Sequence, residues 1–296
     1  MSNAIAKLLN SISFNLISSK IRYYWKFAIA LLMSIALAIS LNPFVANALN
    51  LSDLLRILPS AVQIIQLSSI GDNEEVALGR QIDAQIRREV RISRDRSANA
   101  LVKRLGQILV PTSDRPNIPY TFQVVDDNNL NAFATMGGFV YINTGTIAAA
   151  DNVAQLASVV GHEIGHITGR HALEQMKQTA IAQGIANIAG VADDRLVGIG
   201  VNLALRLPNS REAEFDADRR GLRNITKSGF AASAMPAFMR KLASAGGGNA
   251  PSFLSTHPAT SDRINALNQS IQSNGIQTAG GLNDVEYQRI WKNRFR

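Results

Sequence analysis

The sequence predicts a mostly helical fold that contains one short strand-forming region. Residues 72–92 and 97–110 carry apolar side chains at helical spacing. The period then changes, because 120–127 and 131–146 have the β-branched and aromatic composition of short strands. From residue 152 the helical pattern returns and continues through most of the remaining chain. We therefore expect helices on both sides of a few short strands along the chain.

The first of these elements have recognisable ends. The leading helix is expected to start after an N-cap at Asp72 or Asn73, with acidic residues in its first turn. Its apolar face repeats every four residues, at Leu78, Ile82, Ile86 and Val90. The second helix stops at Pro111, because proline cannot continue the hydrogen-bonding pattern. In the strand region, Gly137-Gly138 marks a turn between two short strands.

The later elements are helical and are separated by glycine and proline. We expect a long helix over 152–183 and another over 210–229, capped by Ser210. Between them, the glycine- and alanine-rich segment 184–208 is interpreted as a helix packed inside the domain rather than as a membrane or partner contact. A flexible loop at 245–252 precedes "STHPATSDRINAL", a loop that enters the final helix.

Charge and cysteine content exclude several classes of function. The formal net charge is +8, but four of the positive charges (Lys7, Lys20, Arg22 and Lys26) lie in an N-terminal stretch without acidic residues. The other 26 basic side chains exceed the 22 acidic ones only slightly, so we expect no nucleic-acid partner. The chain has no cysteine, which excludes disulfides, thiolate zinc ligands and a cysteine nucleophile.

The N-terminus has the order of segments found in a secretory signal peptide. Basic residues precede the uncharged run "FAIALLMSIALAISL", and the small residues Ala46 and Ala48 then flank Asn47. We interpret 1–48 as a signal peptide cleaved after Ala48, with an uncleaved N-terminal anchor as the alternative, and 49–70 as a leading helical segment. Either interpretation exports the chain, to the periplasm or another extracytoplasmic compartment.

The stretch "VVGHEIGHITGRH" contains three of the four histidines of the chain. Residues i and i+4 of a helix lie one above the other, so His162 and His166 can direct imidazole nitrogens at one metal ion. Glu163 lies beside them and can accept a proton from a water that the metal acidifies. His171 lies about 180° around the helix from His162, so we expect it to bond within the fold.

A catalytic zinc site needs a third ligand, and "REAEFDAD" offers candidates. Glu214 and Asp218 are again spaced i and i+4, so one could bind the ion while the other accepts the second N–H of a ligand histidine. Spacing alone leaves Glu212, Glu214, Asp216 and Asp218 eligible, and a solvated acidic face is the alternative. His257, in "STHPAT", is either an oxyanion donor beside the metal or a surface histidine.

Several ordered motifs resemble those of the HtpX/Ste-type family of zinc metallopeptidases (gluzincins), most of all its exported branch. The resemblance covers about residues 71–270 and is carried by "NAFATMGGFVYINTGTI", "VVGHEIGHITGRHALEQM" and "SREAEFDADRRGL". The remaining 271–296 are interpreted as a C-terminal tail. One departure is Met136, where many family members have proline before the two glycines of the hairpin. This loosens the turn but removes no catalytic group.

The resemblance implies an α+β, zincin-like fold, mostly helical with a small sheet beside the His-Glu-x-x-His helix. It implies one Zn²⁺ per chain, held by His162, His166 and Glu214. In the family pattern the first acid of Glu-x-x-x-Asp is the ligand, and Asp218 then stands behind the metal site. The resemblance also supports the oxyanion role of His257.

Together these features predict a zinc metalloendopeptidase in which Glu163 is the general base. The resemblance implies that the strand at Asn131 borders the cleft, so that Asn131, Ala132 and Phe133 contact extended polypeptide. It also implies quality control of unfolded or damaged envelope or membrane proteins. The "IWKNRFR" end could touch a membrane surface, with a helix that covers the core as the alternative. The alternative function is a zinc-containing, chaperone-like module that binds unfolded chains with little hydrolysis.

Overall fold

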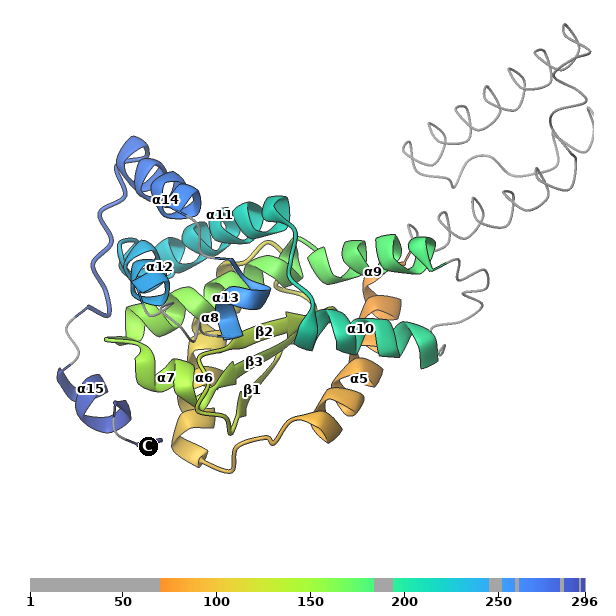
Figure 1. Cartoon of the computed structure of the whole chain (residues 1–296). Helices are drawn as coiled ribbons and strands as arrows, with labels where there is room; N and C mark the ends of the chain where they lie inside the picture. Colours follow the sequence, from red (N-terminus) through yellow and green to blue (C-terminus); the bar gives the residue numbers. More distant parts are fainter. Residues whose placement is uncertain are drawn as a thin grey trace, which may run out of the picture. The chain divides into compact units, whose positions relative to one another are not determined.

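The computed structural model describes residues 70–183, 194–244, 252–258, 261–282, 285–292, 294 and 295 (Figure 1). The expected signal peptide (1–48) and the leading segment up to residue 69 lie outside these residues. The first part of the glycine- and alanine-rich segment and most of the loop at 245–252 also lie outside them. Among the helices of the described part, none is both long enough and apolar enough to cross a membrane.

The helices follow the order that the sequence predicts. Their bounds are α5 (Asp72–Glu89), α6 (Arg96–Leu109), α7 (Thr144–Ala149), α8 (Val153–Thr168), α9 (His171–Ala182), α10 (Asp194–Arg206), α11 (Arg211–Lys227), α12 (Ala234–Ser244), α13 (Ser252–Thr256), α14 (Ser261–Ser273) and α15 (Val285–Trp291). Ser210 caps α11 as expected, because its side chain accepts a hydrogen bond from the Ala213 amide. The N-cap of α5 is Gly71, so the expectation of Asp72 or Asn73 was wrong by one or two residues.

The sheet has three strands, β1 (Thr121–Val125), β2 (Ala132–Thr135) and β3 (Phe139–Asn143), in the order β1-β3-β2. β1 is parallel to β3, and β2 is antiparallel to β3 and forms an edge. The turn between β2 and β3 requires glycine, because Gly137 and Gly138 have φ of 76° and 98°. The strand pattern was expected to continue to residue 146, but the chain enters α7 directly after Asn143.

The long helix predicted over 152–183 is two helices. α8 ends at Thr168, and Arg170 has a left-handed backbone with φ of 57°. Its side chain is held on two sides, since Nη2 donates to the Ile70 carbonyl at 2.7 Å and Nε lies 2.9 Å from Glu75 Oε2. Glu75 is fully buried and also accepts two hydrogen bonds from Arg115. These ion pairs compensate for the free-energy cost of the left-handed backbone at Arg170. Because they join residues far apart in the sequence, helical periodicity does not reveal the break.

Glycines allow α8 and α11 to pack closely (Figure 1). Gly161 and Gly165 lie one turn apart on α8. A Cβ at Gly165 would lie 2.5 Å from the Ala217 carbonyl oxygen of α11, and a Cβ at Gly161 would lie 2.8 Å from the Ile225 side chain. Another face of α8 packs on β2 and β3. The His-Glu-x-x-His helix therefore lies between α11 and the sheet, as expected for the fold class.

Two segments with alternative interpretations are packed within the domain. The described part of the glycine- and alanine-rich segment forms α10, which packs against α5, α9 and β2. At the C-terminus, α15 buries Tyr287 and Trp291, and the Tyr287 hydroxyl donates to the Ile147 carbonyl at 2.7 Å. Arg294 continues this contact by pairing with Asp95, the N-cap of α6. The tail therefore covers the core.

Candidate metal centre

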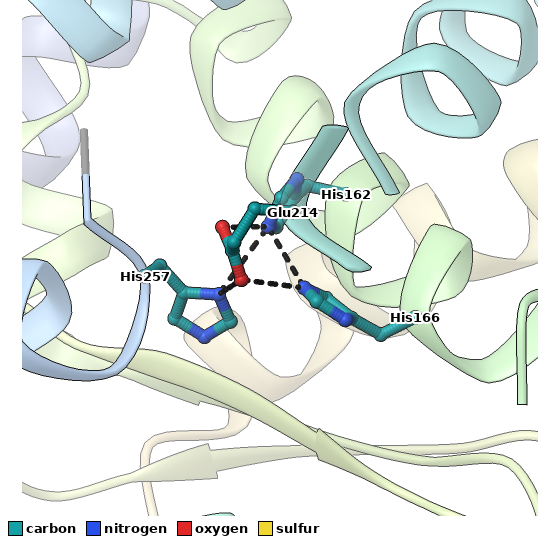
Figure 2. A group of neighbouring side chains, drawn as sticks. All are labelled: His162, His166, Glu214 and His257. Carbon is teal, nitrogen blue, oxygen red and sulfur yellow. Dashed lines mark hydrogen bonds and ion pairs between the residues drawn. The ribbon is translucent and has the colours of Figure 1, made fainter. Parts of the chain in front are cut away.

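Four buried side chains converge on one point between α8, α11 and the residue that follows α13. His162 and His166 come from α8, Glu214 from α11 and His257 from the end of α13, and Figure 2 shows them facing one another. Each is 2–6% exposed, and one ligand atom from each lies within 4.8 Å of the others. The structure thus brings together the three predicted ligands and His257.

The spacing of these donors fits a tetrahedral ion. Zinc–nitrogen bonds of about 2.0–2.1 Å place neighbouring donors about 3.3 Å apart at the corners of a tetrahedron. The observed separations, from Nε2 of His162 to Nε2 of His166, Nδ1 of His257 and Oε2 of Glu214, are 3.1, 3.3 and 3.5 Å. Glu214 Oε1 lies 3.2 Å from His166 Nε2 and 3.0 Å from His257 Nδ1. Three imidazoles and a carboxylate at these distances are a donor set suited to zinc.

Asp218 lies behind the first histidine, one turn along α11 from Glu214. Its Oδ1 is 2.9 Å from His162 Nδ1, so His162 directs Nε2 at the donor cluster. Asp218 is itself held by Arg263 of α14, whose Nε and Nη2 each donate to it at 2.7 Å. Arg263 is 2% exposed, and its Nη1 lies 2.6 Å from Glu214 Oε2. One guanidinium therefore orients both acids of the Glu-x-x-x-Asp element.

The second histidine has a different neighbour. His166 Nδ1 lies 3.0 Å from His171 Nδ1, at the first position of α9. His171 Nε2 lies 3.1 Å from Asp216 Oδ2 of α11. His171 thus bonds within the fold, as expected, and one of its two partners is His166, a predicted metal ligand.

Glu163 is fully buried beside the donor cluster, and neither of its carboxylate oxygens has a hydrogen-bond partner in the described part of the chain. The atom of His257 that faces it, Nε2, lies 3.8 Å from Oε1. Burial raises the pKa of Glu163 above its usual range, since the charged form loses hydration. A buried carboxylate without hydrogen-bond partners destabilises the fold unless a further group binds to it. The position of Glu163 therefore suits an interaction with a water or a substrate proton beside a metal.

The electrostatics differ between the two histidines of α8. Burial lowers the pKa of His166 to about 3, which keeps its imidazole neutral and able to bind a metal. Burial acts in the same direction on His162, but its hydrogen bonds to Asp218 and Glu214 outweigh this and raise its pKa to about 10. The pKa of Glu214 is well below its usual range despite burial, because His257, His162 and His166 surround it. Glu214 is therefore ionised.

A pocket adjoins the donor cluster on the side of β2 and α10. Its lining includes Glu163, His166 and His257 from the site, Phe133, Ala134, Thr135 and Met136 from β2 and its turn, and Leu203 and Leu207 from α10 and the residue after it. Of the three residues expected to contact substrate, Phe133 lines this pocket and also stacks on Tyr141. Ala132 is fully buried in β2, and the Asn131 carbonyl accepts hydrogen bonds from Asn143 and Thr146.

Sequence reasoning missed Arg263 and the pairing of His171 with Asp216. Arg263 lies in the "STHPATSDRI" segment. In the first turn of a predicted helix, the sequence alone does not distinguish a buried arginine from a solvent-exposed one. His171 and Asp216 were both noticed, and only the tertiary structure brings them within 3.1 Å of each other.

Residues 96–271 match peptidase family M48. The chain is 29% identical over 232 residues to the beta-barrel assembly-enhancing protease of Yersinia pestis, which covers 72% of this chain and 47% of that protein. It is 33% identical over 162 residues to the mitochondrial metalloendopeptidase OMA1 of Arabidopsis thaliana, covering 54% and 33%. It is 27% identical over 179 residues to the metalloprotease YcaL of Escherichia coli, covering 58% and 70%. The chain thus spans about half the length of the beta-barrel assembly-enhancing proteases it matches.

Proposed function

Since the chain belongs to peptidase family M48, we propose that it is a zinc-dependent metalloendopeptidase with one Zn²⁺ held by His162, His166 and Glu214. The observation that carries this proposal is the buried, unpartnered carboxylate of Glu163 beside donors spaced about 3.0–3.5 Å apart. A purely structural metal site would not explain why the carboxylate of Glu163 is buried without a hydrogen-bond partner.

Zinc bound at this site would lower the pKa of a water and polarise a carbonyl group. Glu163 accepts the proton of the attacking water on a carboxylate oxygen and later donates it to the leaving amine. Burial of Glu163, which raises its pKa, suits a group that must hold and release a proton near neutral pH. Asp218 keeps Nε2 of His162 directed at the ion through its bond to Nδ1.

His257 is proposed to donate a hydrogen bond to the oxyanion that forms as water attacks. Its Nδ1 lies within 3.3 Å of His162 Nε2, close enough to the metal position for this role. The same atom would have to lose its proton in order to bind the ion itself, so the two roles need different tautomers.

The proposed substrate is extended polypeptide lying along the edge of β2, in the region of Asn131, Ala132 and Phe133. In an antiparallel pair, alternate residues direct their backbone groups away from the partner strand. Asn131 is bonded to β3 through its carbonyl, so the outward backbone groups belong to Ala132, which is fully buried, and to Ala134, which is partly exposed. A segment that adds to an edge strand must be extended, and an unfolded or flexible segment can adopt this conformation. We therefore propose unfolded or damaged envelope or membrane proteins as substrates, in a role in protein quality control.

The expected signal peptide supports an extracytoplasmic location, such as the periplasm, with association at a membrane surface as a further part of this proposal. The "beta-barrel assembly-enhancing protease" relatives support a role near an envelope. Membrane association would not require an amphipathic surface on the domain, because an uncleaved N-terminal anchor would hold the domain at the membrane.

The second candidate function is a zinc-containing module that binds unfolded chains with little hydrolysis. The observation that favours it is His257, whose Nδ1 completes a set of four donors. Structural zinc sites have four protein ligands, whereas catalytic sites keep one position open. A chain in which His257 stays in that position would bind metal and polypeptide without cutting.

The test uses the zinc-loaded full-length chain, a reduced and unfolded protein substrate, and mass spectrometry of the products. We expect wild type to cut and Glu163→Gln to bind one zinc per chain while cutting at least ~100-fold more slowly. His162→Ala should lose both zinc and activity. Unchanged cleavage by Glu163→Gln would exclude the proposed mechanism, and zinc binding without cleavage by wild type would favour the binding module.

A further inference from the structure

We propose that His171 is a positioning residue for the metal site, which holds His166 in the tautomer that binds the ion. The inference rests on the proposed function only in taking His166 as a ligand through Nε2. It adds a second orienting device to the site, distinct from the Asp218 carboxylate that contacts His162.

The geometry places His171 directly behind His166. Nδ1 of His166 and Nδ1 of His171 are 3.0 Å apart, and the two rings meet edge to face at 82° with centroids 5.0 Å apart. The His171 side chain is 12% exposed, so bulk water has little access to this bond. The left-handed residue Arg170 follows the end of α8 and precedes His171, which is the first residue of α9.

Only one arrangement of protons satisfies all three groups when His166 binds a metal. A ligating nitrogen uses its lone pair, so a neutral His166 that binds through Nε2 must carry its proton on Nδ1. That N–H donates to His171, which must therefore present a lone pair at Nδ1 and carry its own proton on Nε2. The Nε2–H then donates to Asp216 Oδ2, 3.1 Å away.

Asp216 is held in place from the other side. Nε of Arg220 donates to Oδ2 at 2.5 Å, and Arg219 donates to Oδ1. The Asp216 carboxylate thus pairs with two guanidinium groups as well as with His171. Nδ1 of His162 contacts a carboxylate directly, whereas Nδ1 of His166 reaches one only through the imidazole of His171. His171 therefore transmits the orientation of Asp216 to the ligand.

The first test measures the dissociation constant of Zn²⁺ in the full-length chain by competition with a chromophoric chelator. His171→Leu fills a similar volume without an acceptor and should weaken zinc binding by about 10–100-fold. His171→Gln should keep most of the affinity, because its amide oxygen can accept from His166 while its NH₂ donates to Asp216. Gln175→Leu, one turn further on α9, removes a hydrogen bond to the Pro208 carbonyl and should leave zinc affinity unchanged.

Wild-type affinity in His171→Leu would overturn the proposal. Equal losses in His171→Leu and His171→Gln would also overturn it, because the effect would then come from packing and not from the hydrogen bond. A second measurement uses zinc-loaded wild type alone: ¹⁵N-detected imidazole NMR should find His171 protonated at Nε2 and His166 at Nδ1. Protonation of His171 at Nδ1 would contradict the inference.

These readouts do not depend on peptide hydrolysis. A wild-type chain that binds zinc but cuts nothing would count against the proposed function and leave the role of His171 intact. A chain that cuts, and whose zinc affinity does not change in His171→Leu, would count against the role of His171 alone.

Discussion

Arg263 and Asp218 form a buried, two-pronged ion pair, with Nε to Oδ2 and Nη2 to Oδ1 both at 2.7 Å. The side chains are 2% and 4% exposed, and the same guanidinium reaches Glu214 through Nη1. It links α14 to α11 at Glu214, the proposed metal ligand, and at Asp218, which contacts His162. The pKa of Asp218 is below its usual range although burial opposes this, because Arg263 and His162 contact it.

We predict that Arg263→Met destabilises the chain by about 3–5 kcal/mol, because it leaves Asp218 buried without its cation. Zinc affinity should fall by about 10–100-fold, since both acids lose their orientation. The matched control is Arg211→Met, which removes an exposed pair with Asp262 between the same two helices. That variant should cost at most about 1 kcal/mol. Urea unfolding and zinc titration check both, and equal effects in the two variants would contradict the prediction.

The role of His257 can be decided by separating metal affinity from turnover. If it donates to the oxyanion, His257→Ala should keep zinc affinity near that of wild type and lower kcat by roughly 100–1000-fold. If it is the fourth ligand, the variant should bind zinc more weakly and cut no more slowly than wild type. Zinc competition and steady-state cleavage of an unfolded substrate distinguish the two patterns.

Close contact between α8 and α11 should depend on Gly165. Gly165→Ala would place a Cβ 2.5 Å from the Ala217 carbonyl oxygen, so the helices must separate. We expect a loss of about 1–3 kcal/mol and weaker zinc binding, since Glu214 moves away from the histidines. Gly198→Ala is the control, because no atom lies within 4 Å of its added Cβ on α10. It should stabilise by about 0.5–1 kcal/mol. A thermal denaturation series that found Gly165→Ala as stable as wild type would refute this packing argument.

Asp95 should stabilise the chain in a pH-dependent way. Its side chain accepts hydrogen bonds from the Ser97 and Ala98 amides and from Arg294, and the bond to Arg294 lowers its pKa in the folded state. A lowered folded pKa stabilises the fold above the unfolded pKa of about 3.9, and this contribution is lost as the pH falls through the folded pKa.

Asp95→Ala should therefore cost about 1 kcal/mol at pH 7, mainly through the lost helix cap, and less as the carboxyl protonates below about pH 4. Asp95→Asn keeps a capping oxygen and should lose less at pH 7. Urea unfolding with EDTA present, at pH 7 and at several values below 4, measures the difference free of metal release. A cost for Asp95→Ala that grew toward low pH would have the wrong sign for this account.

Local patterns in the sequence predict many of the structural features of this chain. The four-residue repeat of α5, the stop at Pro111, the glycine turn between β2 and β3 and the Ser210 cap all depend on contacts within a few residues. The i and i+4 spacing of His162 and His166 likewise follows from helix geometry alone, so these two ligand candidates needed no tertiary information. The break at Arg170 is different, because it depends on Glu75, which is distant in the sequence.

The sequence by itself therefore determined the order of the elements, the histidine pair and the position of Glu163, the proposed base, beside it. Spacing left four acids of α11 equivalent, and only the tertiary structure separates them. The close packing of α8 on α11 directs Glu214 at the donor cluster, Asp218 at His162 and Asp216 at His171, while Glu212 stays exposed. The reason is physical: periodicity sets which residues share a face, but the rotation and depth of one helix against another depend on side chains far apart in the sequence.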